Sequence, residues 1–158
     1  MSFLRFLILL ALVAWIGGIT FFAFVEAPTL FTVLPNTRLA GDVVSPSLSK
    51  LHWMGMISGA VFLICSLIYN QLRHARPKPL AASHVLIALM LLLTAISQFR
   101  VTPKMTSLRA EMQAVDRLPG SDARAQFDRL HAWSTRLEGA VLLLGIGVVA
   151  LMARRDSN

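Results

Sequence analysis

Four long apolar stretches, separated by polar and charged segments, dominate the pattern of this chain. The first three hold 20 to 22 residues each without a formal charge and occupy residues 6–25, 51–72 and 80–99. A helix needs about 20 predominantly apolar residues to cross a hydrocarbon core of roughly 30 Å. Each of these three stretches therefore predicts a membrane-spanning helix.

The fourth apolar stretch, Gly139–Ala153, is shorter. Its 15 residues would cover about 22 Å as a helix, so a complete span must also include Thr135–Glu138. The fourth predicted span is therefore 135–153, with Glu138 inside the membrane. The predicted fold class is all-α: an integral membrane four-helix bundle that forms one domain over residues 1–158.

The third connection, residues 104–134, interleaves acidic and basic residues with apolar ones, a pattern typical of an amphipathic helix outside the membrane. No residue from Ser121 to Arg154 stops a helix. The fourth helix is therefore expected to project beyond the membrane, with the amphipathic segment against it or on the lipid surface. Ser45-Pro46 predicts the start of the second helix, because serine caps a helix and proline suits its first turn.

The chain also contains an internal repeat. Phe24–Pro28 resembles Phe99–Pro103, and Lys50–Trp53 resembles Arg129–Trp133; the prolines are 75 residues apart and the histidines 79. Because each unit holds two spans, the repeat predicts two helical hairpins of the same orientation, related by an axis along the membrane normal. Proline lacks an N–H and clashes with the preceding turn, so both prolines are expected to kink or end their helices.

The composition supports a membrane location. Only 15% of the residues are charged and 56% are apolar, whereas about a quarter of a soluble domain is charged. The net charge of +7 would suit nucleic acid, but Lys and Arg gather at helix ends, where they fix the orientation of a membrane protein. The expected partner is therefore the lipid bilayer, and nucleic acid is not expected.

The basic residues favour one topology. Six of them indicate that both termini and the short loop 73–79 face the cytoplasm: Arg5, Arg73, Arg76, Lys78, Arg154 and Arg155. The opposite side carries nine, seven of them in the long third connection, so a raw count leaves the reverse orientation open. The predicted location is the cell membrane, with several passes.

Ionisable residues within the spans are candidate functional residues, because their exposure to lipid is costly. His131 and Glu138 are seven residues apart, about 20° from each other around a helix, and the repeat pairs His52 with His131. We expect these three side chains to form a cluster in the outer half of the bundle, joined by Glu26, Arg100 and Ser134. Imidazole and carboxylate groups suit copper, zinc and iron, although helix capping and mutual pairing would explain the same residues.

Small residues predict where the helices approach closely. Gly55 and Gly59 form a small-xxx-small pattern that permits close helix packing, and Gly17 and Gly18 are further packing candidates. Cys65 is interpreted as a small core residue. His84, beside the loop 73–79, is expected to be solvated.

The residues around the first helix resemble a known family. The similarity lies in Trp15-Ile-Gly-Gly18, the run Phe21–Phe31 with its Ala27-Pro28, Ala40-Gly41 and Leu51-His52. They are similar to a bacterial membrane family of unknown function related to eukaryotic transmembrane protein 205. A looser similarity exists to the membrane domain of copper-resistance D proteins. The resemblance implies a small four-helix protein of the bacterial inner membrane, with relatives linked to platinum-drug tolerance and membrane trafficking. It implies no metal ligand.

These patterns favour a protein that binds or moves something. The chain has no Gly-rich phosphate loop, no cysteine pair with zinc spacing and no nucleophile elbow, so no enzyme class is indicated and no cofactor is expected by default. The leading hypothesis is a non-enzymatic transport, metal-tolerance or trafficking protein. The alternatives are a haem- or copper-binding redox protein that uses His52 and His131, and a structural binder of lipid or a partner. A homo-oligomer and a small ligand or metal as partner stay open.

Overall fold

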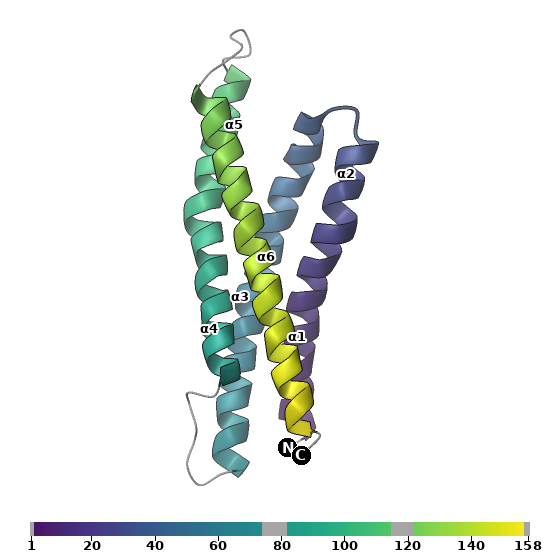
Figure 1. The fold of residues 1–158 in the computed structure, drawn as a ribbon, viewed down its shortest axis with the longest axis vertical. Helices are drawn as coiled ribbons and strands as arrows, with labels where there is room; N and C mark the ends of the chain where they lie inside the picture. Colours follow the sequence, from purple (N-terminus) through teal and green to yellow (C-terminus); the bar gives the residue numbers. More distant parts are fainter. Residues whose placement is uncertain (1, 74–81, 115–121, 157–158) are drawn as a thin grey trace.

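The computed structural model describes residues 2–73, 82–114 and 122–156, and outside one turn these residues are helical (Figure 1). The elements are α1 (Ser2–Phe21), the π-helical turn η1 (Phe22–Glu26), α2 (Ala27–Val33), α3 (Thr37–Arg73), α4 (Ala82–Ile96), the π-helical turn η2 (Ser97–Val101), α5 (Thr102–Ala114) and α6 (Asp122–Asp156). They form four helices long and apolar enough to cross a membrane. The predictions of an all-α fold and a multi-pass membrane protein are confirmed.

The two hairpins run in the same direction. In Figure 1 the unit α1–α2 rises and α3 descends, then α4–α5 rises and α6 descends, and both chain ends lie at the lower end. Helix α1 packs against α3, α4 packs against α6, and α3 and α4 join the two pairs. This parallel arrangement is the one that the internal repeat predicts.

Both prolines of the repeat follow a π-helical turn. The N–H of Ala27 donates to the carbonyl of Phe22, and the N–H of Thr102 donates to the carbonyl of Ser97, each bond spanning five residues instead of four. Of the two expected effects of the prolines, a kink or an end of the helix, the second does not occur, because the chain stays helical to Val33 and to Ala114. The wider turn takes up the hydrogen-bond pattern that a proline interrupts.

Helix α3 starts earlier than Ser45-Pro46 predicts. Leu34 is extended, and the side-chain oxygen of Asn36 accepts a hydrogen bond of 2.8 Å from the N–H of Leu39, an N-cap that begins the helix at Thr37. Pro46 therefore lies inside α3. The helix has 37 residues, about 55 Å at 1.5 Å per residue, so the predicted span 51–72 is its lower part only.

The predicted amphipathic segment is part of the helical bundle. Its first part belongs to α5 and its second part to α6, and these two helices pack along each other. Leu108 and Ala123 are buried there, so α5 lies against the start of α6. Ser121 lies outside the described residues, and the location of the segment beyond the membrane stays a prediction.

The core surrounds one tryptophan. Trp15 on α1 is 1% exposed, and its indole lies across two glycines of α3: a Cβ built on Gly55 would be 2.3 Å from Nε1, and one on Gly59 would be 2.7 Å from Cζ3. Gly18 also contacts α3, where a Cβ would clash with Met54, whereas Gly17 has open space around it. Three of the four predicted packing glycines therefore face a helix neighbour.

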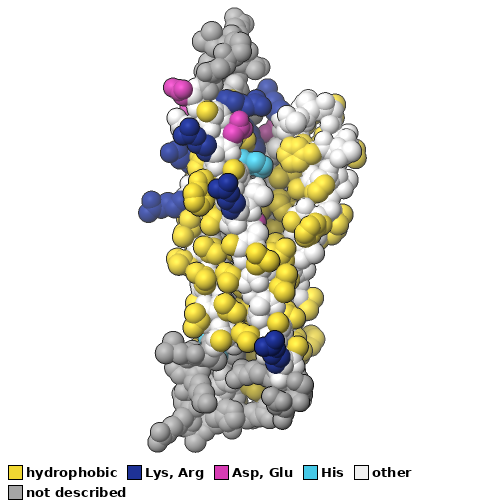
Figure 2. Space-filling view, viewed as in Figure 1, with side chains coloured by type: hydrophobic (Ala, Val, Ile, Leu, Met, Phe, Trp, Pro, Cys, Tyr) yellow, Lys and Arg dark blue, Asp and Glu magenta, His cyan; other side chains and the backbone are white. Residues whose placement is uncertain are grey.

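The described surface is apolar in its middle and carries a cluster of basic side chains at the end away from the termini, called the basic end below. Many large apolar side chains point outward, and Figure 2 shows them as a band below a cluster of Lys and Arg at the end that holds α2, α5 and the start of α6. An apolar belt on a bundle of this length is what a lipid bilayer requires.

Candidate functional site

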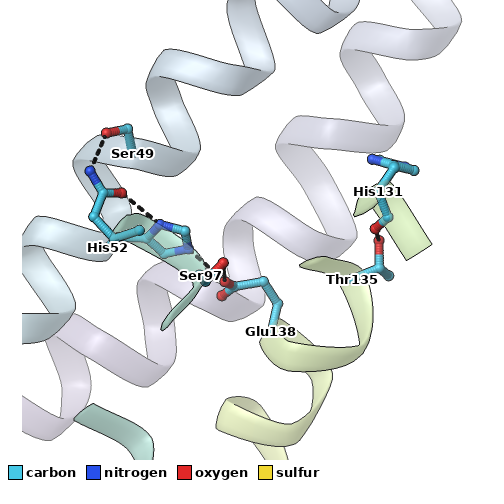
Figure 3. Close-up of polar contacts among 7 residues, drawn as sticks. Ser49, His52, Ser97, His131, Thr135 and Glu138 are labelled. Carbon is cyan, nitrogen blue, oxygen red and sulfur yellow. Dashed lines mark hydrogen bonds and ion pairs between the residues drawn. The ribbon is translucent and has the colours of Figure 1, made fainter. Parts of the chain in front are cut away.

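His52 is the centre of a buried polar group between three helices (Figure 3). The side chain, from α3, is 1% exposed. Its Nδ1 lies 2.9 Å from Oε1 of Gln98 in η2, and its Nε2 lies 2.6 Å from Oε1 of Glu138 in α6. Both ring nitrogens are therefore engaged, and the imidazole links α3 to the other hairpin.

Two serines extend the group at its ends. The amide Nε2 of Gln98 donates to Oγ of Ser49 at 2.9 Å, and the hydroxyl of Ser97 lies 3.4 Å from the Glu138 carboxylate. The five side chains, Ser49, His52, Ser97, Gln98 and Glu138, are called the polar network below. They form one connected set of hydrogen bonds across the bundle (Figure 3).

Helix geometry explains why these residues meet. On α6, Ser134, Val141 and Val148 are buried and share one stripe with Glu138 at helical spacing. The side chain of Glu138 is 14% exposed, so it faces the bundle and not the lipid. The turn η2 supplies two successive residues of the polar network, Ser97 and Gln98, and Ser97 is fully buried.

The hydrogen-bond pattern fixes one proton and leaves another shared. An amide oxygen only accepts, so Nδ1 of His52 carries a hydrogen and donates it to Gln98. Across the 2.6 Å contact, one proton lies between Nε2 and the Glu138 carboxylate. Adding or removing a proton at this pair changes the charge inside the bundle by one.

His131 lies outside the polar network, so the expected cluster of His52, His131 and Glu138 forms only in part. Its side chain is exposed and stacks on Phe127, with ring centroids 6.3 Å apart, and Figure 3 shows it apart from His52. His131 precedes Glu138 by two turns, about 10 Å along α6. Because His52 contacts Glu138 itself, His131 lies two turns farther toward the projecting end.

Of the other expected members of the cluster, Ser134 faces the interior of the bundle, whereas Glu26 and Arg100 do not join the polar network. Ser134 is 5% exposed and faces inward one turn before Glu138. Among the described residues, no hydrogen bond or ion pair joins Glu26 or Arg100 to the polar network, and Arg100 is exposed. Their positions at the ends of two π-helical turns follow the repeat, but the two side chains do not meet His52.

His84 was expected to be solvated, and this expectation is wrong. The side chain is 5% exposed, its Nε2 lies 2.9 Å from Oγ of Ser66, and its ring meets Phe62 edge-on at 6.4 Å. The spacing from His84 to the buried residues Ile87 and Met90 is helical. That spacing was the signal in the sequence that could have identified His84 as a core residue.

The two histidines of the alternative haem or copper site, His52 and His131, do not come together. Within the described ranges, no group of three or more His, Cys, Asp or Glu side chains could hold a metal ion. His52 and His131 are separated, and both nitrogens of His52 bond to protein groups.

A cleft of about 410 Å³ adjoins the polar network at the basic end, between α3 and α5. Its wall includes Ser49, which also accepts the hydrogen bond from Gln98. The remaining lining residues are Asp42, Ser45, Pro46, Thr102, Thr106, Arg109 and Ala110. The polar network thus has one end at an open cleft.

Comparison with known proteins assigns the chain to a family. No curated protein and no solved structure matches the chain. Residues 10–114 match a domain of unknown function, DUF4149. The matched part includes His52, Ser97 and Gln98, whereas Glu138 lies beyond it. The match covers more than half of the chain, which therefore belongs to the DUF4149 family.

Proposed function

We propose that this protein is a non-enzymatic, proton-coupled transport protein in which the His52–Glu138 pair binds the proton. The observation that supports this most directly is the 2.6 Å contact between Nε2 and the carboxylate, buried between the two hairpins. Ionisable pairs inside membrane bundles mark substrate paths and proton relays, because burying them has an energetic cost that packing alone does not require.

One further buried polar group, the hydroxyl of Thr94, lies deeper in the bundle than the polar network. Thr94, one turn from Ser97 on α4, is 1% exposed, and its hydroxyl has no hydrogen-bond partner among the described residues. Below it lies an apolar layer that includes Phe62, Ile87 and Met90, each at most 2% exposed. The polar network is thus open toward the cleft and closed toward the end with the termini, as expected of one state in an alternating cycle.

The cleft provides a route by which a ligand affects the pair. Ser49 lines the cleft and bonds to Gln98, which bonds to His52. An amide does not pass a proton along, but it transmits a change in hydrogen-bond direction. A ligand in the cleft therefore alters the hydrogen bond at Nδ1 of His52. In the reverse direction, protonation of the His52–Glu138 pair alters the hydrogen bonding of Ser49, which the ligand contacts.

The wider assignment follows the same proposal. A bacterial inner-membrane location and a relationship to transmembrane protein 205 fit a small transport protein, and metal tolerance or trafficking would follow from what it transports. Redox chemistry at haem or copper is less well supported, because that alternative needs His52 and His131 in one site. The separation of these histidines favours the proton-coupled function.

Glu138→Gln should abolish proton movement through the bundle. Glutamine keeps the shape and the hydrogen bonds of the carboxyl group but cannot exchange a proton. In liposomes with an internal pH dye and an imposed potassium-diffusion potential, the wild-type protein should raise proton uptake several-fold over empty liposomes. The variant should fall to the level of the empty liposomes.

Glu111→Gln is the matched control, since Glu111 is exposed on α5 and the substitution makes the same change in charge. It should keep the wild-type rate. Equal rates for wild-type protein and empty liposomes, or for Glu138→Gln and the wild type, would remove the basis of the proposed function.

The topology belongs to the proposal as well: both termini face the cytoplasm and the cleft faces the opposite side. In a Cys65→Ala background, an impermeant maleimide should label Ser107→Cys in intact cells and should label Ser2→Cys only after permeabilisation. Both positions are exposed and lie near opposite ends of the bundle. Labelling of position 2 alone in intact cells would show that the orientation is opposite to the proposed one.

A further inference from the structure

The cleft between α3 and α5 has its own chemical character. Helices α3 and α5 diverge toward the basic end of the molecule (Figure 1), and the cleft lies where they separate. Its volume of about 410 Å³ is within the range of pockets for small molecules. The residues 42–49 and 102–110 that line it lie beyond the predicted spans 51–72 and 80–99, and these spans predict that the cleft lies at the depth of lipid headgroups or outside them.

The polar network places a hydrogen-bond donor, the hydroxyl of Ser49, in the wall of this cleft. His52 donates from Nδ1 to Gln98, Gln98 donates from Nε2 to Ser49, and the hydroxyl of Ser49 donates to no described residue. Each bond in such a chain polarises the next. The hydrogen of Ser49 is therefore available to an acceptor that enters the cleft, and a negatively charged oxygen is the best acceptor.

Other groups in the cleft also favour an oxyanion. The hydroxyls of Ser45 and Thr102 have no hydrogen-bond partner among the described residues. Arg109 is held against α3 by a bond of 2.8 Å from Nη1 to the carbonyl of Gly41 and lies over the ring of Phe127 at 5.5 Å. These contacts fix the guanidinium, whose other N–H groups remain for a ligand.

The cleft contains one group of opposite preference. The carboxylate of Asp42 is 43% exposed and forms a long ion pair with Arg109, with 3.9 Å between its Oδ1 and Nη1, beyond the distance of a hydrogen bond. A simple anion would be repelled by this carboxylate, whereas an ammonium group would pair with it. Pro46, Ala110 and the methyl groups of the threonines leave room for a short hydrocarbon part.

We propose that this cleft binds a zwitterion that carries an oxyanion and an ammonium group, with the oxyanion at Arg109 and Ser49 and the ammonium at Asp42. A free amino-phosphate or amino acid has this chemistry, and so has the headgroup of phosphatidylethanolamine. The inference rests on the proposed function for the role of the ligand, but binding itself is independent of proton movement.

The test measures binding of both forms to the full-length protein. O-phosphoethanolamine is titrated calorimetrically into protein in phosphatidylcholine nanodiscs, and native mass spectrometry measures retention of phosphatidylethanolamine against phosphatidylglycerol. Arg109→Gln and Ser49→Ala should each weaken binding about tenfold, as expected when a charged group loses a hydrogen bond. Ser107→Ala, on the same helix but outside the cleft, should bind like the wild type.

The outcomes separate the two sources and the two proposals. Calorimetric binding that depends on Arg109 and Ser49 indicates a free zwitterion, and selective retention of phosphatidylethanolamine with the same dependence indicates a lipid. Ser49→Ala decides the result if Arg109→Gln does not fold. Absence of both kinds of binding, or equal binding in Ser49→Ala, overturns the zwitterion site and leaves proton movement through Glu138 as a separate question. Binding without proton movement would support the zwitterion site and refute the proposed function.

Discussion

His52→Leu is expected to lower the free energy of unfolding by about 3 kcal/mol, because it leaves Glu138 and Gln98 in the bundle without their partner. The imidazole is 1% exposed and bonds to both side chains. Equilibrium unfolding in mixed micelles with increasing SDS content measures the change. His131→Leu is the matched control, since this exposed histidine stacks on Phe127 and lies outside the polar network, and its effect should stay within about 0.5 kcal/mol.

The double variant His52→Leu/Glu138→Leu separates stability from function. Replacing both members of a buried pair with apolar groups is often neutral or stabilising. The double variant should therefore recover most of the stability that His52→Leu loses, yet it should carry no protons in liposomes. Additive losses in the double variant would mean that the two side chains do not interact in the membrane.

Gly55→Ala should destabilise the bundle by about 2 kcal/mol, because the added methyl group overlaps the indole of Trp15. The new Cβ would be 2.3 Å from Nε1 and 2.8 Å from Cδ1, and the ring cannot move away because it also lies against Gly59. The same unfolding assay applies. Trp15→Phe in the Gly55→Ala background should restore part of the loss, since the smaller ring leaves space.

Gly17→Ala provides the opposite result from the same kind of substitution. Nothing lies within 4 Å of a Cβ at Gly17, and alanine favours a helix over glycine by about 1 kcal/mol. This variant should be as stable as the wild type or more stable. If Gly55→Ala and Gly17→Ala have equal effects, the close contact between α1 and α3 is not as described.

Much of the fold could be predicted from the sequence, because lipid imposes length and polarity on each span. The apolar runs predict four helices, and the repeat of Pro28 and Pro103 predicts two hairpins of one orientation. The start of α3 was misplaced because a serine before a proline is a common cap, whereas the cap that forms is Asn36, nine residues earlier. A local motif cannot show which of two caps the tertiary structure uses.

The candidate site was predicted in part. The short fourth run placed Glu138 in the membrane, and the structure puts this residue against His52. The prediction that His131 joins the cluster is wrong, because equivalent positions in a repeat need not lie at equal depth. The roles of Ser49 and Ser97 depend on how far α3 slides along η2, and no spacing within one helix contains that information.

The two π-helical turns also change how relatives of this chain should be aligned. Each turn holds one more residue than an α-helical path would, and one residue rotates everything beyond it by about 100°. A relative with a single-residue gap between Ser97 and Val101 would keep nearly the same length but would present another side of α5 to α3. Arg109 would then point away from Gly41, and a different residue would occupy its place in the cleft. Gaps at this point are therefore expected to distinguish subgroups with different ligands, although the membrane spans themselves stay alike.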